Sequence, residues 1–367
     1  MSQLFPDKLF LLAPMDDVTD TVFRRIVSDC AAPDLTMTEF VNVDGLCSPG
    51  RSKLLARLAT THDTTPVLAQ LWGKQPDNFT IIARELATGL LGDEAYEALL
   101  TEQQPDQLDA QERLALIERY SSEVLNNKFL SPRFCGIDIN FGCPDKAVVK
   151  NECCSALAQP HLRDQAVAIV QATQRGAQSS GQTLPVTIKT RLGFAEIDYS
   201  WHELLLSQQP TLLSVHVRTT KQMSKVPANW PAIEPIVALR NKIAPETKVI
   251  LNGDVMSRQQ GMQLIEQHGV DGIMIGRGLF QDPFAFAETS PWPDYTKQQR
   301  LALYRRHVEL YFATWKEGER SMRPLNKFCK VYINDFPDAK ELRHQCMEAP
   351  DRQSLLALLD AAQAEDR

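Results

Sequence analysis

Eight short runs of apolar and β-branched residues recur along the chain, each followed by a polar or glycine-rich turn and a helical pattern. The runs read KLFLLAPM, LTMTEF, PVLAQLWG, CGIDINFGCP, PVTIKTRLG, LLSVHVRT, KVILNGD and VDGIMIGRG. Apolar runs that alternate with amphipathic segments are typical of parallel strands buried on both faces. Eight such units favour closure, so we predict an α/β fold, a (β/α)8 TIM barrel. No GxGxxG follows the first run, which disfavours a doubly wound dinucleotide-binding sheet.

The 367 residues exceed the ~250 residues of a typical barrel. We expect the barrel domain over residues 1–290 and an all-helical domain over residues 295–367, because Pro-Trp-Pro at 291–293 punctuates the chain and strong helix formers follow. More than sixty residues separate the third and fourth runs. The acidic, helix-patterned segment of about 92–130 is predicted to form a helical excursion outside the barrel, with partial disorder as the alternative.

Composition excludes several classes of protein. Hydrophobic residues make up 43% and charged residues 23%, an ordinary globular balance. The net charge of −7 argues against a surface that binds nucleic acid everywhere, but allows a local basic patch. The N-terminus lacks the basic start of a signal peptide, and no apolar run approaches the ~18 residues of a membrane span. The eight cysteines show no zinc-binding spacing, so we expect a cytoplasmic protein with reduced thiols and no metal.

Polar side chains follow nearly every predicted strand, where a barrel carries its chemistry. The two last strand ends read NGD and GRG. Gly253 and Gly276 would let backbone N–H groups approach an anion, and Arg277 would add a forked charge. These turns therefore predict a phosphate site after the seventh and eighth strands; the alternative is that the glycines only form tight turns.

Other strand ends offer partners for a flat cofactor ring. Lys189 would point into the barrel mouth and need an anionic partner there, such as the edge of a reduced flavin. His216 would bond the cofactor, although either residue could instead be structural. Gln70 offers a donor and an acceptor to a ring amide, and Pro14 with Met15 offers backbone and an apolar face.

Cys143 lies in a Gly-Cys-Pro turn directly after the fourth strand. A thiol with a pKa near ~8.5 holds its proton at neutral pH and can still deliver it to a carbanion. We therefore predict Cys143 to be a catalytic acid; the alternative is a small residue buried in a turn.

Several short motifs occur together in one order: APM-DDVTD, AQLWG, DINFGCP-DKAVVK, VTIKTRLG, VHVRT, NGDV and GIMIGRG. In this order and spacing the chain resembles the tRNA-dihydrouridine synthases over roughly residues 8 to 285. The segment RPLNKFCKVYINDFPDAKELRHQ extends the resemblance into the helical tail.

This resemblance implies a barrel that binds FMN, is reduced by NADPH and passes hydride from flavin N5 to C6 of a uridine in tRNA, while Cys143 protonates C5. It implies a uridine flipped out of its stack. The implied FMN contacts are Pro14, Met15, Gln70, Lys189, His216, Asn252, Gly253, Asp254, Gly276 and Arg277. The implied substrate contacts are Asn140, with Lys150 or Arg191 on the RNA. On the tail, the basic Arg323 and Lys327 are predicted to extend an RNA-binding track; the alternative is a solvated helical face.

The chain departs from the family after the cysteine, where Asn151-Glu152-Cys153-Cys154 replaces small residues, and in the long excursion. The modified uridine is therefore not indicated. Two alternatives remain open: an FMN-dependent barrel oxidoreductase of a small molecule (dihydroorotate dehydrogenase-like or an ene-reductase), and a catalytically silent flavin- or RNA-binding protein. The GCP cysteine and the basic tail favour a tRNA enzyme, and a monomer is expected.

Overall fold

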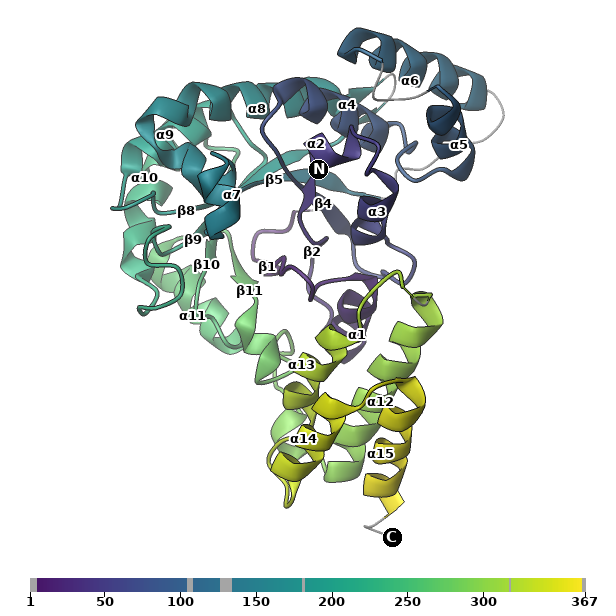
Figure 1. Cartoon of the computed structure of the whole chain (residues 1–367). Coiled ribbons are helices and arrows are strands. Elements are labelled where there is room, and N and C mark those ends of the chain that lie inside the picture. Colours follow the sequence, from purple (N-terminus) through teal and green to yellow (C-terminus); the bar gives the residue numbers. More distant parts are fainter. Residues whose placement is uncertain (1–4, 104–107, 126–133, 180–181, 317, 365–367) are drawn as a thin grey trace.

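A ring of parallel strands forms the centre of the molecule in the computed structural model, which describes residues 5–103, 108–125, 134–179, 182–316 and 318–364 (Figure 1). Neighbouring strands follow the order β1-β11-β10-β9-β8-β5-β4-β2, and a parallel bridge between Leu11 and Leu35 links the first strand to the segment that leads into the last. The predicted TIM barrel is confirmed, because each of the eight apolar runs contains one of its strands. The eight are β1 (Leu9–Leu12), β2 (Thr36–Met37), β4 (Val67–Trp72), β5 (Gly136–Phe141), β8 (Val186–Arg191), β9 (Leu212–His216), β10 (Lys248–Asn252) and β11 (Gly272–Ile275).

Amphipathic helices surround this ring and bury their apolar faces against it (Figure 1). Asp20 caps the first of them by accepting from Phe23 N at 2.8 Å, and Gly269 ends the last in the left-handed conformation. The main helices are α1 (Thr21–Ala31), α4 (Pro76–Ala87), α8 (Arg163–Gly176), α9 (Tyr199–Ser207), α10 (Glu234–Ile243) and α11 (Arg258–His268). Shorter elements are β3 (Val41–Asn42), α2 (Val43–Leu46), α3 (Ser52–Leu55), α7 (Lys146–Lys150) and the hairpin β6 (Gln178–Ser179) with β7 (Gln182–Thr183).

Inward-facing side chains form layers along the barrel axis. The lower part is apolar and contains Leu9, Leu11, Leu68, Leu212 and Ile250 among others. Nearer the mouth, Gln70, Asp138 and Thr187 lie side by side in register on three neighbouring strands. One step further along the strands, Asn140 lies beside Lys189, and His216 beside Asn252. The polarity of the interior therefore rises toward the carboxyl ends of the strands.

Two helices, α5 (Glu94–Glu102) and α6 (Ala110–Leu125), occupy the segment predicted to be an excursion, and they lie outside the barrel next to α4 (Figure 1). Part of that segment, residues 104–107 and 126–130, falls outside the described residues. Glu85 of α4 anchors the excursion, because its buried carboxylate accepts from Arg51 at 2.7 Å, Arg113 at 3.0 Å and Tyr96 at 3.1 Å. The excursion is thus attached to the barrel by a buried, paired charge.

Four helices follow the barrel: α12 (Lys297–Thr314), α13 (Arg323–Tyr332), α14 (Ala339–Glu348) and α15 (Arg352–Ala364). They form a bundle beside α1 (Figure 1), with α12 in contact with that helix. Trp315 donates from its indole nitrogen to Asp20 at 2.8 Å, and Arg320 pairs with the fully buried Glu39. Burial raises the pKa of Glu39, and Arg320 partly counters that rise. None of the helices in the described part of the chain has the length and apolar character needed to cross a bilayer.

Candidate active site at the barrel mouth

A pocket opens at the carboxyl ends of β1, β8, β9, β10 and β11. The lining contains nine of the ten residues that the sequence assigns to a cofactor, and the missing residue is Gln70. The other lining residues are Ala13, Ser224, Val255, Met256 and Met274. The predicted residues in the lining are Pro14, Met15, Lys189, His216, Asn252, Gly253, Asp254, Gly276 and Arg277. Parallel strands bring these positions together although they are spread over most of the barrel sequence.

The wall formed by the β10 and β11 turns suits an anion. Gly253 has a φ of 128°, and a Cβ there would lie 3.0 Å from the His216 ring, so only glycine fits without strain. Asp254 pairs with both Arg218 and Arg277 and accepts from Ala228 N at 3.0 Å. These contacts outweigh burial and lower the pKa of Asp254. The side chain of Arg277 remains 52% exposed, so it can turn toward a ligand phosphate.

His216 is held as a neutral ring. Its Nε2 lies 3.0 Å from Arg218 Nη1, which can only donate, so Nε2 accepts and the proton is assigned to Nδ1. Burial and the cations Arg191 and Lys189 lower its pKa far below the ordinary range. His216 therefore offers the pocket a donor without a charge.

Lys189 lies partly buried in the pocket wall, and no hydrogen bond or ion pair of its ammonium group occurs among the described residues. Burial and Arg191 lower its pKa to about 8, against the opposing effect of Asp138. A partly desolvated ammonium without a close anion is unfavourable on its own. The site therefore fits an anionic group placed against this wall.

The Cys143 turn joins β5 to α7 and is held from three sides. Asn140 Oδ1 accepts from Gly142 N and Cys143 N, both at 3.0 Å. Arg191 Nε donates to Gly142 O at 2.7 Å, and Ser155 Oγ donates to Cys143 O at 2.7 Å. Burial raises the pKa of the half-buried Cys143 thiol, so it keeps its proton at neutral pH. The turn thus presents a fixed, protonated thiol.

The unusual residues after the cysteine form the support of this turn. Cys153 and Cys154 are buried with Val148, and this cluster packs against Trp72 and Cys143. Glu152 and Cys154 have positive φ angles of 59° and 51°, and Glu152 pairs with Lys74 at 2.7 Å. Buried thiols, rather than small side chains, therefore fill the space next to the Cys143 turn.

Seven predicted site residues lie outside the pocket lining: Asn140 and Cys143 at the cysteine turn, Arg323 and Lys327 on α13, and Gln70, Lys150 and Arg191. Gln70 is fully buried and bonds Asp138 and Asn140 at 2.7 and 3.2 Å, beneath the lining. Arg191 is buried, and its Nη1 donates to Thr219 O at 3.2 Å and Met223 O at 2.9 Å, so it ties loops together. Lys150 is exposed at the end of α7. Asp138 was missed by sequence reasoning, although its place two residues before Asn140 on a buried strand puts both side chains on one face.

A second groove runs between the barrel loops and α13. The groove is lined by more cationic than acidic residues. The acidic residues are Asp17 and Glu319, and the cationic residues are Lys53, Arg57, Arg320, Arg323 and Lys327. Arg57 pairs with Asp16, Asp17 and Glu39, whose carboxylate oxygens lie within 4.8 Å of one another. Arg323 and Lys327 are exposed on the first turns of α13. Because Arg57 and Arg320 are paired with carboxylates, the exposed Lys53, Arg323 and Lys327 supply the positive charge of the groove.

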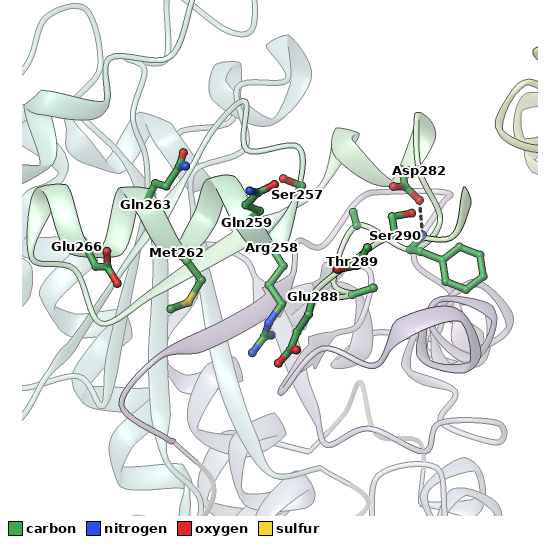
Figure 2. A pocket seen from close by; sticks show the side chains of 13 residues that line it. Ser257, Arg258, Gln259, Met262, Gln263, Glu266, Asp282, Glu288, Thr289 and Ser290 are labelled. Atoms are coloured by element: carbon green, nitrogen blue, oxygen red, sulfur yellow. Dashed lines mark hydrogen bonds between the residues drawn. The ribbon is translucent and has the colours of Figure 1, made fainter. Parts of the chain in front are cut away.

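A third pocket lies outside the barrel wall between α11 and residues 282–290 (Figure 2). Figure 2 shows Met262 and Glu266 on the helix side and Glu288 on the facing segment. Arg258 lies 4.3 Å over the ring of Phe10, on the outer face of β1. This pocket contains none of the predicted site residues and is separate from the barrel mouth.

Fold and site together define a TIM-barrel protein whose mouth combines a pocket lined by glycine turns and Arg277 with a thiol on a fixed turn. Comparison with known families gives the particular one: the dihydrouridine synthase (Dus) family matches residues 11–89 and 128–366. A probable tRNA-dihydrouridine synthase 2 of Bacillus subtilis (strain 168) is 38% identical over 97% of this chain and 94% of its own length. A probable tRNA-dihydrouridine synthase of Staphylococcus aureus (strain COL) is 38% identical over 98% and 94%. The chain belongs to the dihydrouridine synthase family, which places it among the oxidoreductases.

Among solved structures, morphinone reductase aligns with a TM-score of 0.42 at 11% identity, over 77% of this chain and 86% of its own. The family match leaves residues 90–127 unmatched, and this segment contains the whole of α5 and α6.

Proposed function

We propose that this protein is a tRNA-dihydrouridine synthase that reduces the C5–C6 double bond of particular uridines in tRNA. In this proposal FMN is the bound cofactor and NADPH the reductant, and the enzyme acts in the cytoplasm as a monomer. The observation that carries the proposal is that one barrel mouth holds two features: a pocket wall of Gly253, Gly276 and Arg277 that suits an anion, and a half-buried, protonated thiol on the Cys143 turn.

The residues present fit FMN. The turns at Gly253 and Gly276, with Arg277, would hold its phosphate, because they admit close backbone approach and supply a forked cation. Lys189 would stand against the anionic edge of the reduced ring, and the neutral His216 would donate a hydrogen bond. When bound, this group supplies the hydride, from N5 to C6 of the uridine.

The protein's own contribution to the reaction is a proton. Cys143 would protonate C5, because a thiol with a raised pKa retains its proton until a stronger base, the developing carbanion, takes it. Asn140 holds the turn by two backbone hydrogen bonds and would lie beside the substrate ring. A uridine inside a stacked helix could not enter this pocket, so the base must be flipped out.

The RNA would bind the basic groove beside α13, with Arg323 and Lys327 on its phosphates and the exposed Lys150 near the reacting base. The names of the relatives, which specify tRNA, support this choice of substrate. A small-molecule reductase would have no use for such a groove.

The test of the function starts with purified protein. We expect the absorbance of a bound flavin, its bleaching by NADPH, and reoxidation on addition of unmodified tRNA with formation of dihydrouridine. Deleting the gene should remove dihydrouridine from specific positions of cellular tRNA, detected by mass spectrometry of tRNA digests. A protein without flavin, together with unchanged dihydrouridine in the deletion strain, would contradict the proposal.

Reversing two charges of the groove should weaken RNA binding. For Arg323→Glu with Lys327→Glu we expect tRNA affinity at fixed salt to fall about tenfold or more. The negative slope of the logarithm of the association constant against log salt should become shallower by about 2. Filter binding of tRNA at several salt concentrations measures both. The control, Lys242→Glu with Lys340→Glu, makes the same change of charge at exposed positions of α10 and α14. Equal losses in both double variants would show that only total charge matters.

A further inference from the structure

A continuous hydrogen-bond relay runs from the barrel interior to the cysteine turn. Thr187 Oγ1 donates to Asp138 Oδ1 at 2.5 Å, and Gln70 Nε2 donates to Asp138 Oδ2 at 2.7 Å. Asn140 Nδ2 then donates to Gln70 Oε1 at 3.2 Å. The last link is Asn140 Oδ1, which accepts from Gly142 N and Cys143 N. Four residues on three adjacent strands thus connect to the turn.

The direction of this relay is set at its buried end. An ionised carboxylate can only accept, so Asp138 requires Gln70 to present its amide nitrogen. The Gln70 oxygen then faces Asn140 and requires the nitrogen of that amide. The oxygen of Asn140 is left to face the turn, where two backbone N–H groups need an acceptor. Asp138 is fully buried, so water cannot substitute for any of these partners.

We propose that Asp138 is a positioning residue: its buried negative charge fixes the orientation of the Gln70 and Asn140 amides and thereby holds the Cys143 turn in place. The charge is retained at neutral pH, because burial raises the pKa of Asp138 only to about 6, with Thr187, Gln70 and Lys189 opposing the rise. The link to uridine reduction rests on the proposed function; the control of the turn does not.

Removing the charge should release the turn. In Asp138→Asn, the new amide can donate to Gln70, which allows the Gln70 amide and then the Asn140 amide to invert. An inverted Asn140 would present its NH₂ group to Gly142 N–H and Cys143 N–H, and both hydrogen bonds would be lost. The half-buried Cys143 thiol should then become more accessible.

The relay also predicts a rescue. In Asp138→Asn with Gln70→Glu, the carboxylate moves one position along the relay without a change of total charge or much change of volume. The carboxylate at position 70 would accept from the new amide at position 138 and from the Asn140 amide nitrogen, so the Asn140 oxygen again faces the turn. If Asp138 mattered only for packing, moving the carboxylate to position 70 would give no such rescue of the single variant.

The readout is the alkylation rate of Cys143 in the full-length protein, followed by mass spectrometry of the peptide that contains it. We expect Asp138→Asn to raise this rate about fivefold, the factor equivalent to about 1 kcal/mol of lost hydrogen bonding, and the double variant to return to the wild-type rate. An unchanged rate in the single variant, or a raised rate in the double variant, would overturn the proposal. If Asp138→Asn does not fold, Gln70→Met breaks the same relay and should raise the rate likewise.

Turnover separates this inference from the proposed function. With tRNA, Asp138→Asn should lower the rate of uridine reduction about 10–100-fold with little change in tRNA affinity, because the acid is misplaced rather than removed. A wild-type protein that forms no dihydrouridine would end the proposed function and leave the alkylation result standing. Full turnover in Asp138→Asn, in an active wild type, would end the positioning role alone.

Discussion

Replacing Cys143 with alanine is expected to leave the flavin content unchanged and to lower the rate of uridine reduction by about 10²–10⁴-fold, the usual contribution of one positioned acid. The thiol lies on a turn fixed by Asn140, Arg191 and Ser155, and it is absent from the lining of the barrel-mouth pocket. Its loss should therefore spare cofactor binding and reduction by NADPH. Stopped-flow measurement of flavin reduction by NADPH and of reoxidation by tRNA separates the two half-reactions.

The matched control is Cys153→Ala, which removes a thiol from the cluster that packs against the same turn. Because Cys153 is buried and faces this cluster rather than the pocket, we expect reoxidation by tRNA to stay within about threefold of the wild-type rate. Normal reoxidation in Cys143→Ala would mean that another group delivers the proton. Equal losses in both variants would point to packing of the turn rather than to acid catalysis.

The barrel was predictable because its signal is local. Each strand is a continuous apolar run, and the polar residue at its carboxyl end follows within a few positions. One short stretch of sequence therefore identifies both the strand and the side chain at the edge of the sheet. Closure of the barrel then brings nine of the ten predicted cofactor residues into one pocket. Lys189 and His216, for example, converge only because β8 and β9 are parallel neighbours in register.

Side-chain direction was not predictable in the same way, because it depends on partners distant in sequence. Gln70 turns its amide to Asp138, 68 positions away, and Arg191 turns to backbone carbonyls of two loops. The contact between Glu39 and Arg320 spans 281 positions and has no local pattern. Asp138 itself could have been noticed, since a carboxylate within a buried strand needs partners; the alternation of the strand puts it on the face of Asn140.

Replacing Lys189 with methionine is expected to act in opposite directions on cofactor binding and on stability. The ammonium group has no hydrogen-bond or ion-pair partner among the described residues, and burial lowers its pKa from about 10.5 to about 8. The flavin-free variant should therefore be more stable by about 1–2 kcal/mol at pH 7, because part of the gain is offset when Asp138 loses a neighbouring cation. Flavin affinity should fall by about 10–100-fold, the loss expected for one charge-assisted contact.

The pH dependence of the stability gap isolates Lys189. Between pH 8 and 10.5 the unfolded lysine binds more protons than the folded one, so wild-type stability rises with pH across this window, whereas methionine does not titrate. The gap in unfolding free energy between the two flavin-free proteins should be full below pH 8 and shrink as the pH approaches 10.5. Urea unfolding from pH 6 to 10 measures it, with the exposed Lys221→Met as a control expected to change stability by less than about 0.5 kcal/mol. A variant less stable than wild type at pH 7, or a gap independent of pH, would mean that Lys189 is already satisfied within the folded protein and does not await an anionic ligand.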